Sequence, residues 1–327
     1  HSFPTRRSSD LGRRQRRGSR GAASLPWWPR NLRGSMSPAR STKGFDEAHL
    51  RALLEPLAGH RALIGLDVDG TLVDHAGIMD PRVKKALHAV REAGHHIVIA
   101  TGRSLNTTLP IVRVAGVSDG WSVSANGAVT TKITGAGDDD YEIVETVTFD
   151  PEPALRAMYQ AVPTARFAIE RASGGFIGTE SFDDLDFGIQ AEPASIEELF
   201  GAKEVVRVVV TAPDIPLDEF ARIVERAGVS GCEYAVGWSS WLDMSAPGTT
   251  KASALEALRE RLGVDPEHTV TVGDGSNDVE MLDWAAVGVA MGQASERVKS
   301  YADAETLSID EHGAELVLRH LLSADPR

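Results

Sequence analysis

The sequence has 327 residues, of which 42% are hydrophobic, so it can bury the cores of one to three domains. Its single cysteine, Cys232, excludes an intrachain disulfide and a thiolate metal cluster, which suits a reducing cytoplasm. The formal net charge is −13, and this acidic balance disfavours nucleic acid and anionic membranes as partners.

The N-terminal segment, residues 1–45, is rich in Arg, Gly, Ser and Pro and has no helical or strand period, so we expect a disordered basic segment. Residues 1–42 hold ten arginines and one acid, which leaves 24 basic and 46 acidic residues after them. Residues 1–11 resemble the translation of a common sequencing adapter, which suggests an artefact and a true start at Met36. The alternative, a basic arm that binds nucleic acid, finds no support later in the chain.

The chain shows no sign of membrane insertion or secretion. No apolar run approaches the roughly 18 residues that span a bilayer, and the basic N-terminus lacks the apolar segment of a signal peptide. We therefore expect a cytoplasmic protein.

The regular pattern begins with a helix over residues 46–57 and a buried strand, "ALIGL", over residues 62–66. A helix follows Pro81 and stops at Gly94, where glycine can adopt the left-handed cap, and a second strand, "HIVIA", occupies residues 96–100. Strand, helix and strand within about 40 residues form a βαβ unit, so the two strands should be parallel. "WSVSANGAV" then predicts a strand that turns at Asn126-Gly127.

The middle of the chain changes character. Residues 148–237 contain strand candidates ("RFAIE", "GGFIGTE", "EVVRVVVTA") separated by helical segments such as "PLDEFARIVERAG", which indicates an inserted α/β cap. Residues 46–147 and 238–327 then form one doubly wound, Rossmann-like parallel-sheet core. After the insertion we expect helices and strands in alternation: a helix over 250–262, a strand over 269–273, a helix over 277–286, a strand over 287–291, and helices over 293–302 and 312–322.

Reactive side chains follow four strand ends or open helices of this core. They are Asp67 and Asp69 in "DVDGT", residues 101–103 ("TGR"), Lys251, and residues 273–278 ("GDGSND"). Ligands of an open parallel sheet bind beyond the carboxyl ends of its strands, so these groups should converge. Neighbouring carboxylates need a cation, and oxygen ligands without nearby His or Cys favour Mg²⁺ over zinc.

A calcium loop does not explain the two acidic segments. In "DVDGT" the sixth and twelfth loop positions would be Leu72 and Ile78, and in "GDGSND" they would be Val279 and Ala285. An EF-hand loop needs glycine and glutamate at those positions.

Taken singly, several of these residues have ordinary structural explanations. Thr101 could cap a helix, Lys251 could be a surface lysine, and Asp274 and Asp278 could be helix-start acids favoured by the helix dipole. The convergence of all of them at one sheet edge favours a site instead.

The four segments resemble the four motifs of the haloacid dehalogenase (HAD) superfamily. Their spacing, with the insertion between Arg103 and Lys251, resembles the Cof-type phosphatases with a class IIB cap. The likeness covers about residues 60–322, including "SANGAV", "KASALEAL", "GDGSNDVEMLDWA" and "GVAMGQASERVKSYAD". It implies a hydrolase that acts on phosphoric monoesters.

The resemblance implies a role for each acid of "DVDGT". Asp67 would attack phosphorus to form an aspartyl-phosphate, and Asp69 would protonate the leaving group and then take the proton of the hydrolytic water. Gly70 would let the backbone approach the phosphate.

The resemblance also assigns the groups that surround the phosphate. Thr101 is expected at a helix start, where free amides point outward. The expected phosphate-binding residues are Gly70, Thr101, Gly102, Lys251 and Asn277. The expected Mg²⁺ ligands are Asp67, Asp69 through its main-chain carbonyl, Asp274 and Asp278, the last as a ligand or as an acceptor behind the ligands.

The resemblance implies that the substrate is a small phosphorylated metabolite, and the sequence leaves its identity open: a sugar phosphate, a phosphorylated polyol or a cofactor phosphate. A phosphomutase is the alternative, but the insertion has few basic residues for a second phosphate. Arg103 and Asp243 are candidates for contact with substrate, although a structural ion pair would equally explain Arg103. Trp238 and Trp241 could line the entrance or pack in a core. The oligomeric state is not predicted.

Overall fold

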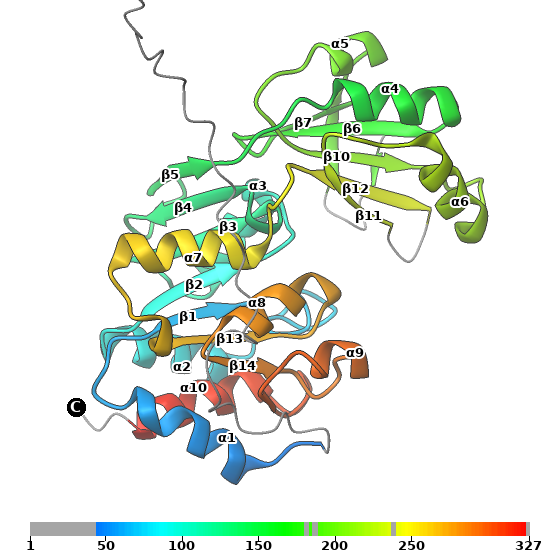
Figure 1. Ribbon diagram of the computed structural model, residues 1–327. Coiled ribbons are helices and arrows are strands. Elements are labelled where there is room, and N and C mark those ends of the chain that lie inside the picture. The colour runs from blue at the N-terminus through cyan, green and yellow to red at the C-terminus, as the bar shows by residue number, and fades with distance from the viewer. Residues whose placement is uncertain (1–43, 180–182, 185–188, 237–239, 325–327) are drawn as a thin grey trace, which may run out of the picture.

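The computed structural model describes residues 44–179, 183–184, 189–236 and 240–324. The predicted N-terminal segment up to residue 43 and Trp238 lie outside these ranges. The described chain forms two β-sheets, one in the core and one in the insertion, each with its own helices (Figure 1).

The core sheet has eight strands in the order β15-β14-β13-β1-β2-β3-β4-β5. β1 pairs in parallel with both β2 and β13, whereas β4 and β5 extend one edge antiparallel. This confirms the predicted doubly wound parallel sheet. The strands are β1 (Leu63–Leu66), β2 (His96–Ala100), β3 (Gly120–Ser124), β4 (Val129–Ile133), β5 (Tyr141–Thr146), β13 (Thr269–Gly273), β14 (Val287–Ala290) and β15 (Ala304–Glu305).

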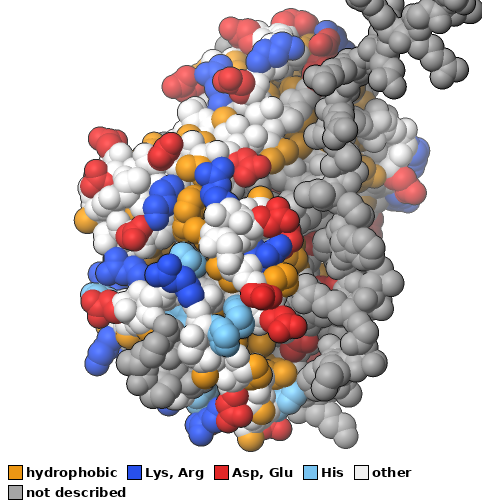
Figure 2. All heavy atoms as spheres, turned by 60° about the vertical axis from the view of Figure 1, so that its left-hand side comes forward, with side chains coloured by type: hydrophobic (Ala, Val, Ile, Leu, Met, Phe, Trp, Pro, Cys, Tyr) orange, Lys and Arg blue, Asp and Glu red, His pale blue; other side chains and the backbone are white. Residues whose placement is uncertain are grey.

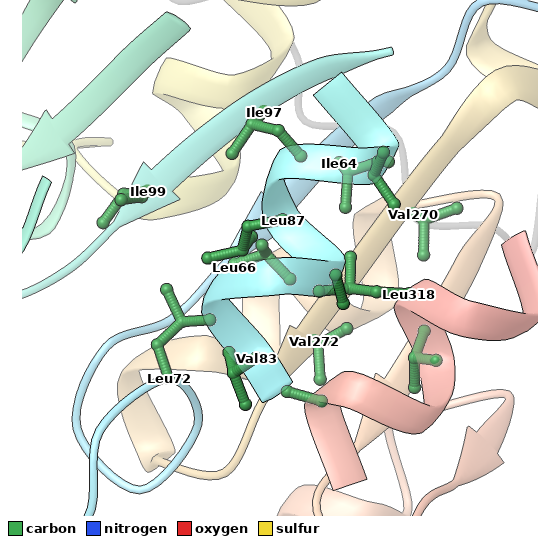
Figure 3. Packing of buried hydrophobic residues seen from close by; sticks show 14 of the residues in the cluster. Ile64, Leu66, Leu72, Val83, Leu87, Ile97, Ile99, Val270, Val272 and Leu318 are labelled. Atoms are coloured by element: carbon green, nitrogen blue, oxygen red, sulfur yellow. The ribbon is translucent and has the colours of Figure 1, made fainter. Parts of the chain in front are cut away.

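Helices cover both faces of this sheet, which is why β1, β13 and β14 are buried along their whole length. Ile64 and Leu66 of β1 lie against Leu87 and Leu318 of two helices on one face (Figure 3). That face carries α1 (Glu47–Leu54), α2 (Pro81–Glu92), α3 (Leu105–Val114) and α10 (Gly313–Ala324), and the other carries α7 (Lys251–Leu262) and α8 (Val279–Trp284).

Two predicted helices after the insertion are shorter than expected. The helix expected over 277–286 is a 3₁₀ turn, Ser276–Asp278, followed by α8, which stops at Ala285 because that residue is extended and leads into β14. The helix expected over 293–302 is only α9 (Glu296–Lys299), because Ser295 caps it and its side chain accepts the N–H of Val298.

The inserted sheet is mixed, with the strand order β11-β12-β10-β6-β7-β9-β8. Its helices cover the face turned away from the core and enclose a separate apolar interior that includes Phe167, Val208 and Phe220 (Figure 1). The elements are α4 (Glu152–Ala161), β6 (Arg166–Arg171), β7 (Phe176–Gly178), β8 (Asp183–Asp184), β9 (Ile189–Pro193), α5 (Ile196–Phe200), β10 (Val205–Thr211), α6 (Leu217–Ala227), β11 (Glu233–Val236) and β12 (Trp241–Ser245).

Acidic and basic side chains are interspersed over the face shown in Figure 2. Among the described residues, no helix has both the length and the apolar character needed to cross a bilayer.

Candidate active site

Three carboxylates meet at the carboxyl ends of β1 and β13. Asp67 follows β1 and Asp274 follows β13, and the two strands are held in register because the N–H of Asp67 donates to the carbonyl of Val272 at 3.0 Å. Oxygen atoms of Asp67, Asp274 and Asp278 all lie within 4.8 Å of one another. The parallel pairing of the strands therefore assembles this acidic cluster.

Lys251 enters the cluster from the first position of α7. Its Nζ donates to Oδ1 of Asp67 at 2.6 Å and to Oδ1 of Asp278 at 2.7 Å, and its side chain is fully buried. Thr250 fixes the start of α7 through reciprocal hydrogen bonds with Ser253. Lys251 is thus not the surface lysine that its sequence position alone would allow.

The pKa values reflect the crowding of these charges. Burial raises the pKa of Asp67 to about 8, Asp278 and Asp274 add to the rise, and Lys251 opposes it. Burial also raises the pKa of Asp274. For Lys251, burial alone would lower the pKa, but Asp278 and Asp67 together raise it. The cluster holds more carboxylates than Lys251 can neutralise, and their hard oxygen donors fit a divalent cation such as Mg²⁺.

Asp278 stabilises the loop that carries Asp274. Its Oδ2 accepts the main-chain N–H groups of Asp274 (3.0 Å) and Gly275 (2.8 Å), while its Oδ1 accepts from Lys251. Because both oxygens already accept hydrogen bonds, this arrangement favours Asp278 as an acceptor that positions its neighbours.

Asp69 lies outside the group of three. Its side chain is 58% exposed, and its carboxylate forms a bidentate pair with Arg103, with Nε to Oδ2 at 2.9 Å and Nη2 to Oδ1 at 2.5 Å. Of the two alternatives for Arg103, the structure contains the ion pair. Arg103 therefore orients the most exposed of these four acids.

Thr101 follows β2, but it does not begin a helix. α3 starts at Leu105, and its N-cap is Ser104, whose side chain accepts the N–H of Thr107. The expectation of Thr101 at a helix start is therefore wrong, because three residues separate it from α3. Its hydroxyl is buried and accepts the N–H of Arg103 at 3.1 Å, so its own hydrogen remains available to donate.

Asn277 contacts a residue that the sequence analysis did not place in the site. Its Nδ2 donates to Oδ1 of Asn126 at 3.0 Å. Asn126 adopts the left-handed conformation, with φ 53° and ψ 30°, in the turn after β3. A Cβ at Gly102 would lie 2.9 Å from Oδ1 of Asn126, so Gly102 allows the two asparagines to meet beside Thr101. "SANGAV" indicated the turn but not this contact.

Gln293 is a second residue missed from sequence. Its Nε2 donates to the carbonyl of Gly70 at 2.6 Å and to Oδ2 of Asp274 at 3.2 Å, while its Oε1 accepts the N–H of Ile309 at 3.0 Å. Gly70 has φ +79°, and a Cβ there would lie 2.3 Å from Oδ2 of Asp274. Gln293 follows β14 at the same edge of the sheet, which is the signal that could have found it.

The cap candidates have mixed positions. Trp241 is buried with Ala168 and Val209, so it packs in the cap, and its Nε1 donates to Oδ2 of Asp243 at 2.8 Å. Asp243 is partly exposed, and its Oδ1 lies 3.8 Å from Nη1 of Arg207.

Comparison with known proteins identifies the class of enzyme that this fold and site define. Residues 64–318 match the model of the haloacid dehalogenase-like hydrolases, and the chain belongs to that family. This confirms the resemblance found in the sequence.

Individual relatives make the assignment more specific. Phosphatase YwpJ of Bacillus subtilis is 28% identical over 293 residues, which cover 80% of this chain and 99% of that protein. Pyridoxal phosphate phosphatase YbhA of Escherichia coli is 28% identical over 74% of this chain and 91% of its own length. The HAD subclass IIB sugar phosphatase BT4131 superimposes with a TM-score of 0.65 at 27% identity, covering 79% of this chain and 98% of that structure. The chain is thus a HAD-type phosphatase with the subclass IIB fold.

Proposed function

We propose that this enzyme is a Mg²⁺-dependent phosphatase that hydrolyses a small phosphorylated metabolite, a sugar phosphate or a cofactor phosphate, through an aspartyl-phosphate on Asp67. The observation that carries the proposal is the cluster of Asp67, Asp274 and Asp278 around Lys251 at the carboxyl edge of the core sheet. Such an edge is where open α/β sheets bind ligands.

The first half of the reaction forms the covalent intermediate. A carboxylate oxygen of Asp67 bonds to phosphorus as the bond from phosphorus to the ester oxygen breaks. Asp69 takes up a proton from solvent as one of its oxygens leaves Arg103, and it gives this proton to the departing alkoxide. Thr101 donates its hydroxyl hydrogen, and Lys251 directs its positive charge, toward the phosphoryl oxygens.

The second half releases inorganic phosphate. Asp69 accepts a proton from the water that attacks the aspartyl-phosphate, and Asp67 leaves as a carboxylate, so the enzyme returns to its starting state. Asp67, Asp274 and the main-chain carbonyl of Asp69 would hold Mg²⁺, with Gln293 and Asp278 orienting this set. When bound, Mg²⁺ supplies positive charge that offsets the carboxylates and the phosphoryl oxygens.

The substrate class follows from relatives and from the cap. Matching proteins act on pyridoxal phosphate and on sugar phosphates, as their names state. A mutase would need a free basic group in the cap for a second phosphate. Arg207 of the cap sheet is engaged with Glu170, so it is not such a free group.

A panel of phosphate monoesters, assayed for phosphate release with Mg²⁺ and with EDTA, tests the proposal. We expect Mg²⁺-dependent release that Asp67→Asn abolishes and that the exposed control Asp119→Asn leaves unchanged. Absence of release from every ester, or equal release by Asp67→Asn, would contradict it. Conversion of one sugar phosphate into its isomer without phosphate release would indicate the mutase instead.

A further inference from the structure

The cap rests on the segment of the core that holds Thr101 and Arg103. Val206 of β10 is buried among Leu105 of α3, Ala125 of the turn that contains Asn126, and Val129 of β4. A Cβ at Gly174 of the cap would lie 3.0 Å from the Cβ of Leu105, so the two backbones approach closely here. The position of the cap is therefore tied to the start of α3.

A buried arginine crosses this boundary beside Val206. Nη1 of Arg207 donates to the main-chain carbonyl of Gly102 at 3.0 Å, and Nε donates to Oε2 of Glu170 at 2.9 Å. The side chains of Arg207 and Glu170 are 11% and 0% exposed. The guanidinium also lies 5.4 Å from the centre of the Phe176 ring. With its carboxylate partner and the ring on the cap side, Arg207 has a fixed direction toward Gly102.

The carbonyl that Arg207 contacts belongs to the peptide between Gly102 and Arg103. The N–H of that same peptide donates to Oγ1 of Thr101 at 3.1 Å. One planar group therefore links the cap guanidinium to the threonine hydroxyl, and a positive charge on its carbonyl strengthens the N–H as a donor. The bond occupies a lone pair of Oγ1 and leaves the hydroxyl hydrogen to donate elsewhere. The residue that follows this peptide, Arg103, forms the ion pair with Asp69.

We propose that Arg207 is a positioning residue that acts across the boundary between cap and core: it holds the 102–103 peptide so that Thr101 presents its hydroxyl hydrogen and Arg103 orients Asp69. The inference rests on the proposed function for its effect on rate. It assigns to the cap a part in setting the catalytic geometry that is independent of the leaving group.

Kinetics of matched variants test this role. Removal of Arg207 alone would leave Glu170 buried and unpaired, so the main variant is Glu170→Met/Arg207→Met, in which both charges are absent. We expect kcat to fall by about tenfold or more, because small misplacements of reacting groups are costly. The fall should be similar for acetyl phosphate, p-nitrophenyl phosphate and sugar phosphates, with KM changed less than kcat. Arg207→Lys should recover part of the rate. Arg222→Met, at an exposed position of α6, is the control and should match the wild type.

Hydrogen exchange gives a readout that needs no activity. In the folded double variant we expect faster amide exchange in the peptide that contains residues 101–106, with exchange in β1 and β13 unchanged. A loss confined to KM for bulky leaving groups would make Arg207 a substrate-binding residue and overturn the proposal. Unchanged exchange at 101–106 would overturn it as well. If no phosphoester is hydrolysed, the proposed function fails, and the exchange experiment still tests the structural link.

Discussion

Replacement of Asp67 by asparagine should make the metal-free fold more stable at alkaline pH. Burial raises the pKa of this carboxyl from its ordinary 3.8 to about 8. The unfolded chain therefore ionises Asp67 near pH 4 and the folded chain near pH 8, so the free energy of unfolding falls as the pH rises between these values. Each pKa unit is worth about 1.4 kcal/mol, so the loss is at most about 6 kcal/mol.

The asparagine variant would avoid this loss, because an amide stays neutral and its oxygen can still accept from Lys251. Local relaxation reduces the full figure, so we expect Asp67→Asn to exceed the wild type by at least about 2 kcal/mol at pH 8 and to match it near pH 4. Urea unfolding in EDTA at several pH values measures the difference. Histidines titrate in both proteins and cancel in the comparison. The exposed control Asp119→Asn should keep the wild-type slope between pH 5 and 8, because hydrogen bonding to Lys132 lowers the pKa of Asp119 and confines its titration to more acidic pH.

Magnesium should narrow the difference between the two proteins. The wild type should gain about 2.7 kcal/mol at a Mg²⁺ concentration of one hundred times Kd, whereas the variant, with one carboxylate fewer, should gain less. Equal pH dependence of stability for the wild type and Asp67→Asn in EDTA would refute the electrostatic account of this site.

Three further predictions concern other parts of the molecule. Asp69→Asn should lower kcat for an alkyl phosphate by about 10²–10⁴-fold and less for p-nitrophenyl phosphate, whose leaving group needs no proton; equal losses would argue against the acid role. Gln293→Ala should weaken Mg²⁺ binding about tenfold or more in calorimetry because it frees Asp274, whereas the exposed control Gln190→Ala should not; identical affinities would exclude the orienting role. Phe220→Ala should cost about 3–5 kcal/mol in urea unfolding of the cap, since this ring is fully buried, and a cost below about 1 kcal/mol would mean that the site collapses.

The main features of the fold could be predicted because they depend on local patterns. "ALIGL" is apolar throughout and "HIVIA" is apolar after His96, as expected for strands covered on both faces, and Pro81 and Gly94 bracket α2. The lengths of the helices after the insertion were harder to predict. The start of α9 depends on a single hydrogen bond of Ser295, and the end of α8 depends on the extended backbone of Ala285. The domain boundaries stay predictions.

The acids of the site could be predicted because each follows a strand, and parallel strands end at one edge. Residues that act through side-chain contacts could not. Asn126 and Asn277 are 151 positions apart, and Arg207 and Gly102 are 105 positions apart, so no local pattern relates them. Arg207 counted in the sequence only as one of few basic residues of the insertion. Its contact depends on how the cap docks, which is a property of the assembled fold.

The separate apolar interior of the inserted sheet has an evolutionary consequence. Substitutions among Phe167, Val208 and Phe220 are absorbed within the insertion, because none of these side chains belongs to the clusters that pack around β1 and β13. Selection can therefore change the substrate preference of such an enzyme without destabilising β1 and β13, the strands that Asp67 and Asp274 follow. Only the few residues that contact each other between cap and core, such as Arg207 and Gly102, need to be conserved together.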